Sequence, residues 1–219
     1  MKAPEFDLGV YLVTDRACCG PRGVEAVVSA AIAGGVTLVQ LRDKQADARP
    51  MLALGRRLLE LLRPAGIALV VNDRIDVAQA LDADGVHIGQ QDLPYPEARR
   101  LLGPGKIIGV SIGGDAEARE AAGWDVDYVG VGPAFATATK ADAGAALGIG
   151  ETARLARLSG HRAVAIGGID GSNAAALYAA GLEGVAVISA ICSAADPDAA
   201  TRRLLGLMRE HRAPIGATR

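Results

Sequence analysis

Short apolar runs rich in β-branched residues alternate with stretches rich in Ala and Leu along the whole chain, and this alternation constrains the fold most. The predicted strands are residues 9–14, 38–41, 68–72, 85–88, 107–111, 128–131, 163–166 and 184–188. Most of these runs are continuously apolar, which is typical of parallel strands covered on both faces. Strand and helix in strict alternation predict an α/β fold with a parallel sheet.

The segments between the predicted strands have helical composition. The predicted helices are residues 23–33, 49–62, 75–81, 115–122, 152–158, 172–180 and 197–209. Several begin at a capping residue or proline and end at glycine, as from Asp115 to Gly123 and from Ser172 to Gly181.

Eight strand–helix units without a break in composition predict one closed (β/α)₈ TIM barrel as a single domain over residues 1–219. The length of 219 residues fits, since such barrels typically need roughly 200–250 residues. Only 3% of the residues are aromatic, so the core must be built from Val, Ile, Leu and Ala. An open doubly wound sheet remains the alternative fold.

The charge balance and the apolar segments exclude several classes of partner. With 23 Lys and Arg against 25 Asp and Glu, the chain has no nucleic-acid footprint. Residues 24–39 are the most apolar stretch, but Glu25 and the Gly34-Gly35 pair interrupt them, so we expect no membrane span. The start of the chain does not resemble a signal peptide. The sequence leaves the oligomeric state open, and a homo-oligomer is compatible with it.

Cysteine usage points to a reducing compartment. Cys18, Cys19 and Cys192 have neither metal-ligand spacing nor an obvious bridging partner, so we expect free, inert thiols and a cytoplasmic protein.

Polar residues follow the predicted strands, where a barrel enzyme builds its active site. Gln40, Arg42 and Lys44 are two residues apart, so an extended backbone would point all three into the mouth of the barrel. A guanidinium can bind phosphate oxygens through two parallel hydrogen bonds, and a lysine adds a point charge. The alternative is a frayed strand end with solvated charges.

Asp73 and Asp92 each follow a strand and could meet across adjacent loops. Two carboxylates with room for water suit Mg²⁺, which also takes substrate phosphates as ligands. The alternative is that both aspartates cap the helices that follow them, Asp73 in particular.

Two later loops predict a second anion site. Gly167-Gly168 follows the seventh strand and Ile188-Ser189 the eighth, the positions where barrels commonly bind phosphate through backbone N–H groups. Residues 132–147 form a loop longer than most connections, and such loops are usually lids or disordered. His87, at the end of the fourth strand, is either a hydrogen-bonded core histidine or a residue with a chemical role.

The chain resembles the thiamine-phosphate synthase family over nearly its full length. The matching motifs are Tyr-Leu-Val-Thr-Asp at 11–15, Val-Gln-Leu-Arg-Asp-Lys at 39–44, Val-Asn-Asp-Arg at 71–74, Asp-Gly-Val-His-Ile-Gly-Gln at 84–90, Asp-Leu-Pro at 92–94, Ile-Gly-Val-Ser at 108–111, Tyr-Val-Gly-Val-Gly-Pro at 128–133, Thr-Ala-Thr-Lys at 137–140, Ala-Ile-Gly-Gly-Ile at 165–169 and Gly-Val-Ala-Val-Ile-Ser-Ala-Ile at 184–191.

The resemblance implies a transferase that joins hydroxymethylpyrimidine diphosphate to a thiazole phosphate, with or without a carboxyl group, and releases pyrophosphate. It implies Mg²⁺ on Asp73 and Asp92, and catalytic roles for Arg42, Lys44, Ser111 and Lys140. The residues implied for the pyrimidine diphosphate are Gln40, Leu41, Arg42, Asp43, Lys44, Asn72, Ser111 and Lys140, and those for the thiazole phosphate are Thr137, Ala138, Thr139, Gly168, Ile188 and Ser189.

The sequence departs from the family in two places. Ala138 stands where the family commonly has proline, and Ile-Gly-Gly follows Ser111 where the family often has a more polar stretch. Three other functions compete with the synthase: a thiazole tautomerase of the same superfamily, a non-catalytic thiamine-pathway sensor and another phosphate-binding barrel isomerase. The tautomerase would need neither a diphosphate site nor a metal. The residues that argue against it are Arg42, Lys44, Asp73, Asp92 and Lys140.

Overall fold

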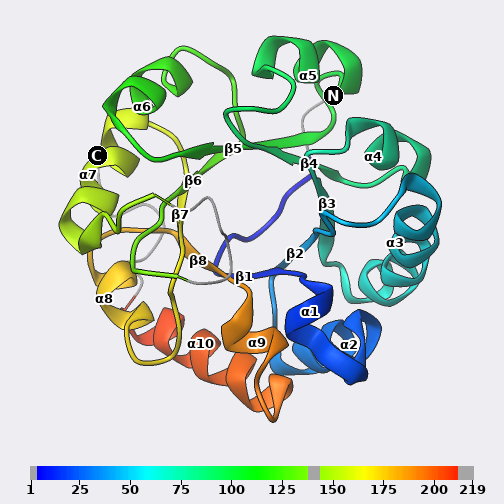
Figure 1. The fold of residues 1–219 in the computed structure, drawn as a ribbon. Helices are drawn as coiled ribbons and strands as arrows, with labels where there is room; N and C mark the ends of the chain where they lie inside the picture. Colours follow the sequence, from blue (N-terminus) through cyan, green and yellow to red (C-terminus); the bar gives the residue numbers. More distant parts are fainter. Residues whose placement is uncertain (1–3, 138–143, 212–219) are drawn as a thin grey trace.

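The protein is a closed barrel of eight parallel strands in the computed structural model, which describes residues 4–137 and 144–211 (Figure 1). The strands are β1 (Val10–Val13), β2 (Leu38–Leu41), β3 (Ala68–Asn72), β4 (Gly85–Ile88), β5 (Ile107–Ile112), β6 (Tyr128–Val131), β7 (Ala163–Ile166) and β8 (Gly184–Val187). Their bounds match the predicted runs to within one residue at each end.

Hydrogen bonding between the first and last strands closes the sheet. Tyr11 of β1 lies opposite Leu38 of β2 on one side and opposite Ala186 of β8 on the other. Every other strand pairs with its neighbours in sequence. The barrel prediction is therefore confirmed, and the open doubly wound sheet is wrong.

Helices surround the barrel as an outer ring (Figure 1). They are α1 (Arg16–Cys19), α2 (Val24–Gly34), α3 (Ala48–Leu62), α4 (Ile75–Leu81), α5 (Tyr95–Leu102), α6 (Asp115–Ala121), α7 (Gly148–Ser159), α8 (Ala174–Ala179), α9 (Ser189–Cys192) and α10 (Pro197–His211). The sequence reading missed α1, α5 and α9. Two of these are single turns too short to show a period, and α5 has Pro96 inside its first turn.

Two predicted helix starts differ from the structure: α7 begins at Gly148 and not at residue 152, and α8 begins at Ala174 and not at residue 172. Ser172 does not begin α8, because its hydroxyl is bonded to Asp170 and the helix starts two positions later, after Asn173. The predicted start of α6 at Asp115 is confirmed, although the capping residue is Gly114. At Ser172 a short polar side chain satisfies a local turn, a role that composition alone does not separate from capping.

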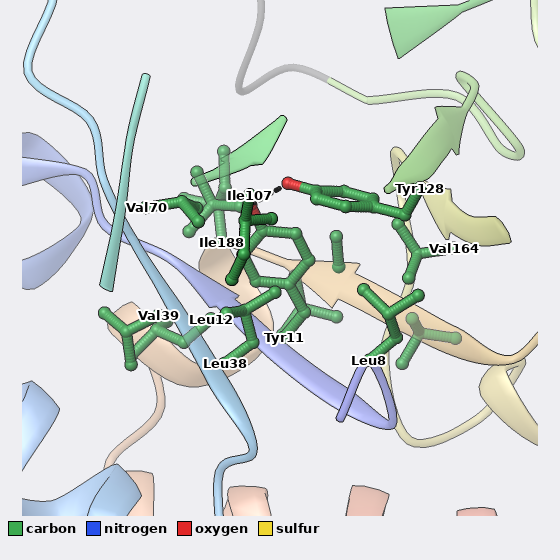
Figure 2. Packing of buried hydrophobic residues seen from close by; sticks show 14 of the residues in the cluster. Leu8, Tyr11, Leu12, Leu38, Val39, Val70, Ile107, Tyr128, Val164 and Ile188 are labelled. Carbon is green, nitrogen blue, oxygen red and sulfur yellow. Dashed lines mark hydrogen bonds between the residues drawn. The ribbon is translucent and has the colours of Figure 1, made fainter. Parts of the chain in front are cut away.

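The N-terminal segment crosses one mouth of the barrel before β1 begins (Figure 1, blue). Leu8 is fully buried there, and the ring of Phe6 lies edge-on to Tyr128 at 5.9 Å between centroids. Inside the barrel the two tyrosines, Tyr11 and Tyr128, are the largest of the buried side chains shown in Figure 2. This end of the barrel is packed, which leaves the opposite rim for a site.

Among the described helices, none is long and apolar enough to cross a bilayer. The apolar stretch at residues 24–39 forms α2, a turn and the start of β2, as expected.

The close contact of Gly184 with the N-terminal segment gives a stability test. A Cβ at Gly184 would lie 1.7 Å from the backbone oxygen of Leu8, so Gly184→Ala should displace the N-terminal segment around Leu8, the plug of this end of the barrel. The substitution should destabilise the protein by roughly 1–3 kcal/mol. Gly206→Ala is the matched control, because this glycine lies in α10 with open space around it. The control should stabilise the protein by about 0.5–1 kcal/mol. Urea unfolding midpoints measure both; equal stability of the two variants would contradict the packing described.

Candidate functional site

The carboxyl ends of the strands surround an open cavity of about 370 Å³. Because all eight strands are parallel, residues that follow different strands converge on this one rim. Side chains from the second to the sixth strand–loop units face the cavity, among them Arg42, Lys44, Asn72, Asp73, His87, Asp92, Ser111 and Thr137.

Arg42 is a buried cation held in place from behind. Its Nη1 lies 3.0 Å from Asp15 Oδ2, and its backbone N–H donates to the hydroxyl of Thr14. Its side chain is only 8% exposed, and among the described residues its buried Nε has no hydrogen-bond partner. An unpaired buried guanidinium N–H is costly, so this donor suits an anion bound in the cavity.

Asp73 and Asp92 bring two carboxyl groups within hydrogen-bonding reach of each other at the rim. Burial, followed by the hydrogen bond and charge of Asp92, raises the pKa of Asp73 to about 6, against the opposing effect of Lys44 and Arg42. Asp92 is fixed from its other side, since the N–H of Gly89 donates to its Oδ2 at 2.7 Å. Like-charged groups this close favour binding of a cation.

The alternative role of Asp73 as a helix cap is wrong. The cap of α4 is Arg74, and its first turn has no side-chain capping bond. Asp73 instead has φ of 62°, in the left-handed region that few residues other than glycine adopt. Asp73 lines the cavity, and the sequence did not predict this backbone conformation.

The donor set at the rim fits magnesium better than zinc. Within residues 4–137 and 144–211 no group of three or more His, Cys, Asp or Glu side chains is arranged to hold a metal. A structural zinc site needs four such ligands, whereas Mg²⁺ is commonly held by one or two carboxylates plus water and phosphate oxygens.

A smaller recess adjoins the cavity beside β7 and β8. Gly168, Ile188 and Ser189 line it together with Thr137. Gly167 and Gly168 both have positive φ, 100° and 63°, and α9 begins at Ser189 directly after β8. Because glycine has no side chain, an anion can approach the backbone N–H groups here closely, as expected of a small anion site.

The long loop after β6 is tied together at its two ends. Leu147 N–H donates to Pro133 O, and Gly148 N–H donates to Ala134 O. The first part of the loop also runs along the end of β7, where Phe135 N–H donates to Gly167 O. Ala138, Thr139 and Lys140, which the resemblance assigns to the two substrate sites, lie outside the described residues.

Leu41 and Asp43 are not brought to the cavity by their side chains. Leu41 is fully buried toward α3, where a Cβ on Gly55 would touch it. Asp43 pairs with Arg16 and accepts backbone N–H bonds from the turn that follows. The strand ends at Leu41, so the predicted extended backbone does not reach Lys44, which lies in a turn but still lines the cavity.

His87 joins the site to the barrel interior. It is a hydrogen-bonded core histidine and also lines the cavity, so a core position does not exclude a chemical role. Its Nε2 lies 2.8 Å from Ser111 Oγ and its Nδ1 lies 2.9 Å from Tyr128 Oη. Tyr128 in turn contacts Tyr11, whose hydroxyl accepts from Gln40. Sequence reasoning missed both tyrosines, because each lies within an apolar strand; their hydroxyls were the only signal.

A family model, sequence relatives and a solved structure all place the chain in the same family. A family model described as thiamine monophosphate synthase matches residues 10–191. A thiamine-phosphate synthase of Roseiflexus sp. (strain RS-1) is 50% identical over 195 residues, 89% of this chain and 83% of the relative. Another, from Moorella thermoacetica, is 49% identical over 201 residues, 92% and 95% of the two chains. The solved structure of a thiamine phosphate pyrophosphorylase from Pyrococcus furiosus superposes with a TM-score of 0.86 at 37% identity, covering 94% of this chain and 98% of that one.

The paired carboxyl groups should cost stability when no cation is present. In EDTA at pH 8, Asp73→Asn and Asp92→Asn should each raise the melting temperature, since either change removes one of two charges in contact. The double variant should gain little beyond the better single one, because one substitution already relieves the repulsion. Asp125→Asn, at an exposed position outside any helix or strand, is the control and should change little. Calorimetry measures all four; additive gains would show that the two groups do not interact.

Proposed function

The chain belongs to the thiamine-phosphate synthase family and is an enzyme of the transferase class, and we propose that its rim cavity joins hydroxymethylpyrimidine diphosphate to a thiazole phosphate. The products are thiamine phosphate and pyrophosphate. The observation that carries this proposal is the buried Arg42, which lines the cavity with an unpaired Nε–H and shares that cavity with the carboxyl pair. A positively charged hydrogen-bond donor and two carboxylates on one rim suit a diphosphate accompanied by a metal ion.

The reaction replaces a C–O bond by a C–N bond. The bond between the pyrimidine methylene carbon and the diphosphate breaks, and pyrophosphate leaves with the electron pair. An electron-rich aminopyrimidine can carry the resulting cation, and the lone pair of the thiazole nitrogen then forms the new bond. No covalent intermediate with the protein is needed, so the protein contributes position and charge.

The residues around Arg42 would bind the diphosphate. The ion pair with Asp15 holds the guanidinium of Arg42 before substrate arrives, and the Thr14 hydroxyl holds the Arg42 backbone, so the charge is preorganised for the leaving group. Lys44 lines the same wall and would add a second positive charge. Ser111, on the opposite side, would donate its hydroxyl to a phosphate oxygen.

Asp73 and Asp92 would hold Mg²⁺ between the protein and the diphosphate. When bound, this ion supplies positive charge to the oxygens of the leaving pyrophosphate. The two carboxyl groups would also order the loops after β3 and β4, because the cation relieves their mutual repulsion.

The recess beside β7 and β8 would bind the phosphate of the thiazole. Its backbone N–H groups at Gly168 and Ser189 would anchor that phosphate, and the recess opens into the larger cavity through Thr137, Ile166 and Gly167, which line both. The thiazole nitrogen is then presented to the pyrimidine from a fixed position, which favours attack over capture of the cation by water.

We place this reaction in the cytoplasm, with small phosphorylated molecules as the partners of the protein. The three cysteines are free thiols, which suits a reducing compartment. The decisive assay mixes both substrates with Mg²⁺ and detects thiamine phosphate by chromatography. Conversion of a thiazole phosphate isomer without any condensation would identify a tautomerase instead.

Removing the metal should abolish the condensation. We expect EDTA to stop product formation and added Mg²⁺ to restore it, because the leaving pyrophosphate would otherwise face two uncompensated carboxylates. Asp92→Asn should raise the Mg²⁺ concentration needed for half-maximal rate by roughly tenfold or more. Circular dichroism checks that the variant is folded. Full activity in metal-free buffer would remove the metal from this mechanism.

The two anion sites should respond to different substitutions. Arg42→Ala should lower kcat/KM for the pyrimidine diphosphate by roughly a hundredfold, the effect expected for a lost charge-stabilising contact. Gly168→Ala should chiefly raise KM for the thiazole phosphate, since a Cβ there would lie 2.4 Å from Ala136 O and displace the loop. Steady-state kinetics with each substrate varied in turn separates the two. Equal losses for both substrates in each folded variant would contradict the assignment.

A further inference from the structure

A continuous line of hydrogen bonds crosses the interior of the barrel beneath the cavity. Gln40 Nε2 donates to Tyr11 Oη at 2.5 Å, and Tyr11 Oη lies 2.8 Å from Tyr128 Oη. Tyr128 Oη lies 2.9 Å from His87 Nδ1, and His87 Nε2 lies 2.8 Å from Ser111 Oγ. Figure 2 shows the contact between the two tyrosines. The line ends at His87 and Ser111, which line the cavity, whereas Gln40, Tyr11 and Tyr128 are buried below it and are not among the residues that line it.

Both phenols keep their protons. Burial raises the pKa of Tyr11 and of Tyr128 above the ordinary tyrosine value, and each is only 0–1% exposed. Each hydroxyl therefore has one hydrogen to donate, and a buried donor without an acceptor is costly.

The amide of Gln40 sets the direction of the whole line. Tyr11 accepts from the Gln40 amide, so its own hydrogen is used only if it donates to Tyr128. Tyr128 must then donate to Nδ1 of His87, which leaves the proton of the neutral imidazole on Nε2. Nε2 donates to Ser111 Oγ, so the hydroxyl hydrogen of Ser111 is directed away from the histidine.

Two glycines make room for this line. A Cβ on Gly109 of β5 would lie 2.1 Å from the ring of Tyr128, and a Cβ on Gly130 of β6 would lie 3.1 Å from the ring of His87. Neither glycine has a positive φ, so backbone conformation does not require glycine at either position. Glycine at these two positions leaves space for the aromatic rings of Tyr128 and His87 between neighbouring strands.

We propose that Tyr11 and Tyr128 are positioning residues for the condensation, acting through His87 to aim the hydroxyl hydrogen of Ser111 at the diphosphate. Neither tyrosine is among the residues that line the rim cavity. While neutral His87 donates from Nε2, the hydroxyl hydrogen of Ser111 is available to a phosphate oxygen, and the hydrogen bond from Tyr128 to Nδ1 favours this tautomer. This inference rests on the proposed function, because it assigns the target of Ser111 to the diphosphate.

The kinetic test removes one hydroxyl from the line. Tyr128→Phe keeps the ring and should lower kcat/KM for the pyrimidine diphosphate roughly tenfold, the order expected for one lost hydrogen bond. KM for the thiazole phosphate should stay unchanged. In a Ser111→Ala background the same substitution should have no further effect, since its action passes through Ser111.

Tyr178→Phe is the matched control. Tyr178 is also 1% exposed, and its hydroxyl donates to the backbone oxygen of Gly9, away from the line. It should lose stability much as Tyr128→Phe does, yet keep wild-type kcat/KM for both substrates. A loss in Tyr128→Phe that is equal for both substrates, matched by Tyr178→Phe or additive with Ser111→Ala would overturn the proposal, as would no loss.

A second measurement needs no activity and so separates this inference from the proposed function. In ¹⁵N-histidine NMR spectra of the ligand-free protein, His87 should carry its proton on Nε2, and Tyr128→Phe should shift its tautomer populations. His161→Gln and His211→Gln identify the signals of the other two histidines. A proton on Nδ1, or an imidazolium at pH 8, would overturn the relay even if the wild type condenses its substrates. Failure of the wild type to condense them, with the Nε2 tautomer present, would refute the function alone.

Discussion

Closure of the sheet between β8 and β1 is the constraint on which the rest of the structure depends. Parallel strands joined edge to edge leave no free edge, and every strand then ends at the same rim. Arg42 after β2, Asp73 after β3 and Ser111 on β5 are distant in sequence, yet they face one cavity because the register of the strands brings them there. The chemistry of the site is therefore a consequence of connectivity and register.

The rim also gathers groups that oppose folding. An unpaired guanidinium N–H at Arg42 and the contact between Asp73 and Asp92 would each be removed by selection for stability alone. The apolar strands and the N-terminal plug around Leu8 stabilise the barrel enough to tolerate them. Unfavourable polar contacts are concentrated at one rim, and close apolar packing is found at the other. This difference distinguishes the rim that binds ligands from the end of the barrel that stabilises the fold.

Much of the barrel could be predicted from the sequence because buried parallel strands are continuous apolar runs that periodicity detects. The cavity residues Arg42, Asn72 and Asp92 could be found for a related reason, since charged or amide residues directly after such runs are conspicuous. What the sequence could not supply was conformation. The positive φ of Asp73 and the single helical turn at α9 depend on tertiary contacts that no local pattern records.

The two tyrosines show a different limit of prediction from sequence, which concerns polar atoms buried in the core. A tyrosine in an apolar strand counts as packing in any hydrophobic pattern, yet each buried hydroxyl must find a partner. In a barrel the inward positions of neighbouring strands lie next to one another, so the partner of Tyr11 is found on β6, 117 positions away, in Tyr128. The same geometry carries the bond on to His87 and up to the rim. Buried polar atoms in the core of such a barrel are thus candidates for a part in the site above them, and glycines such as Gly109 mark where the strands leave room for them.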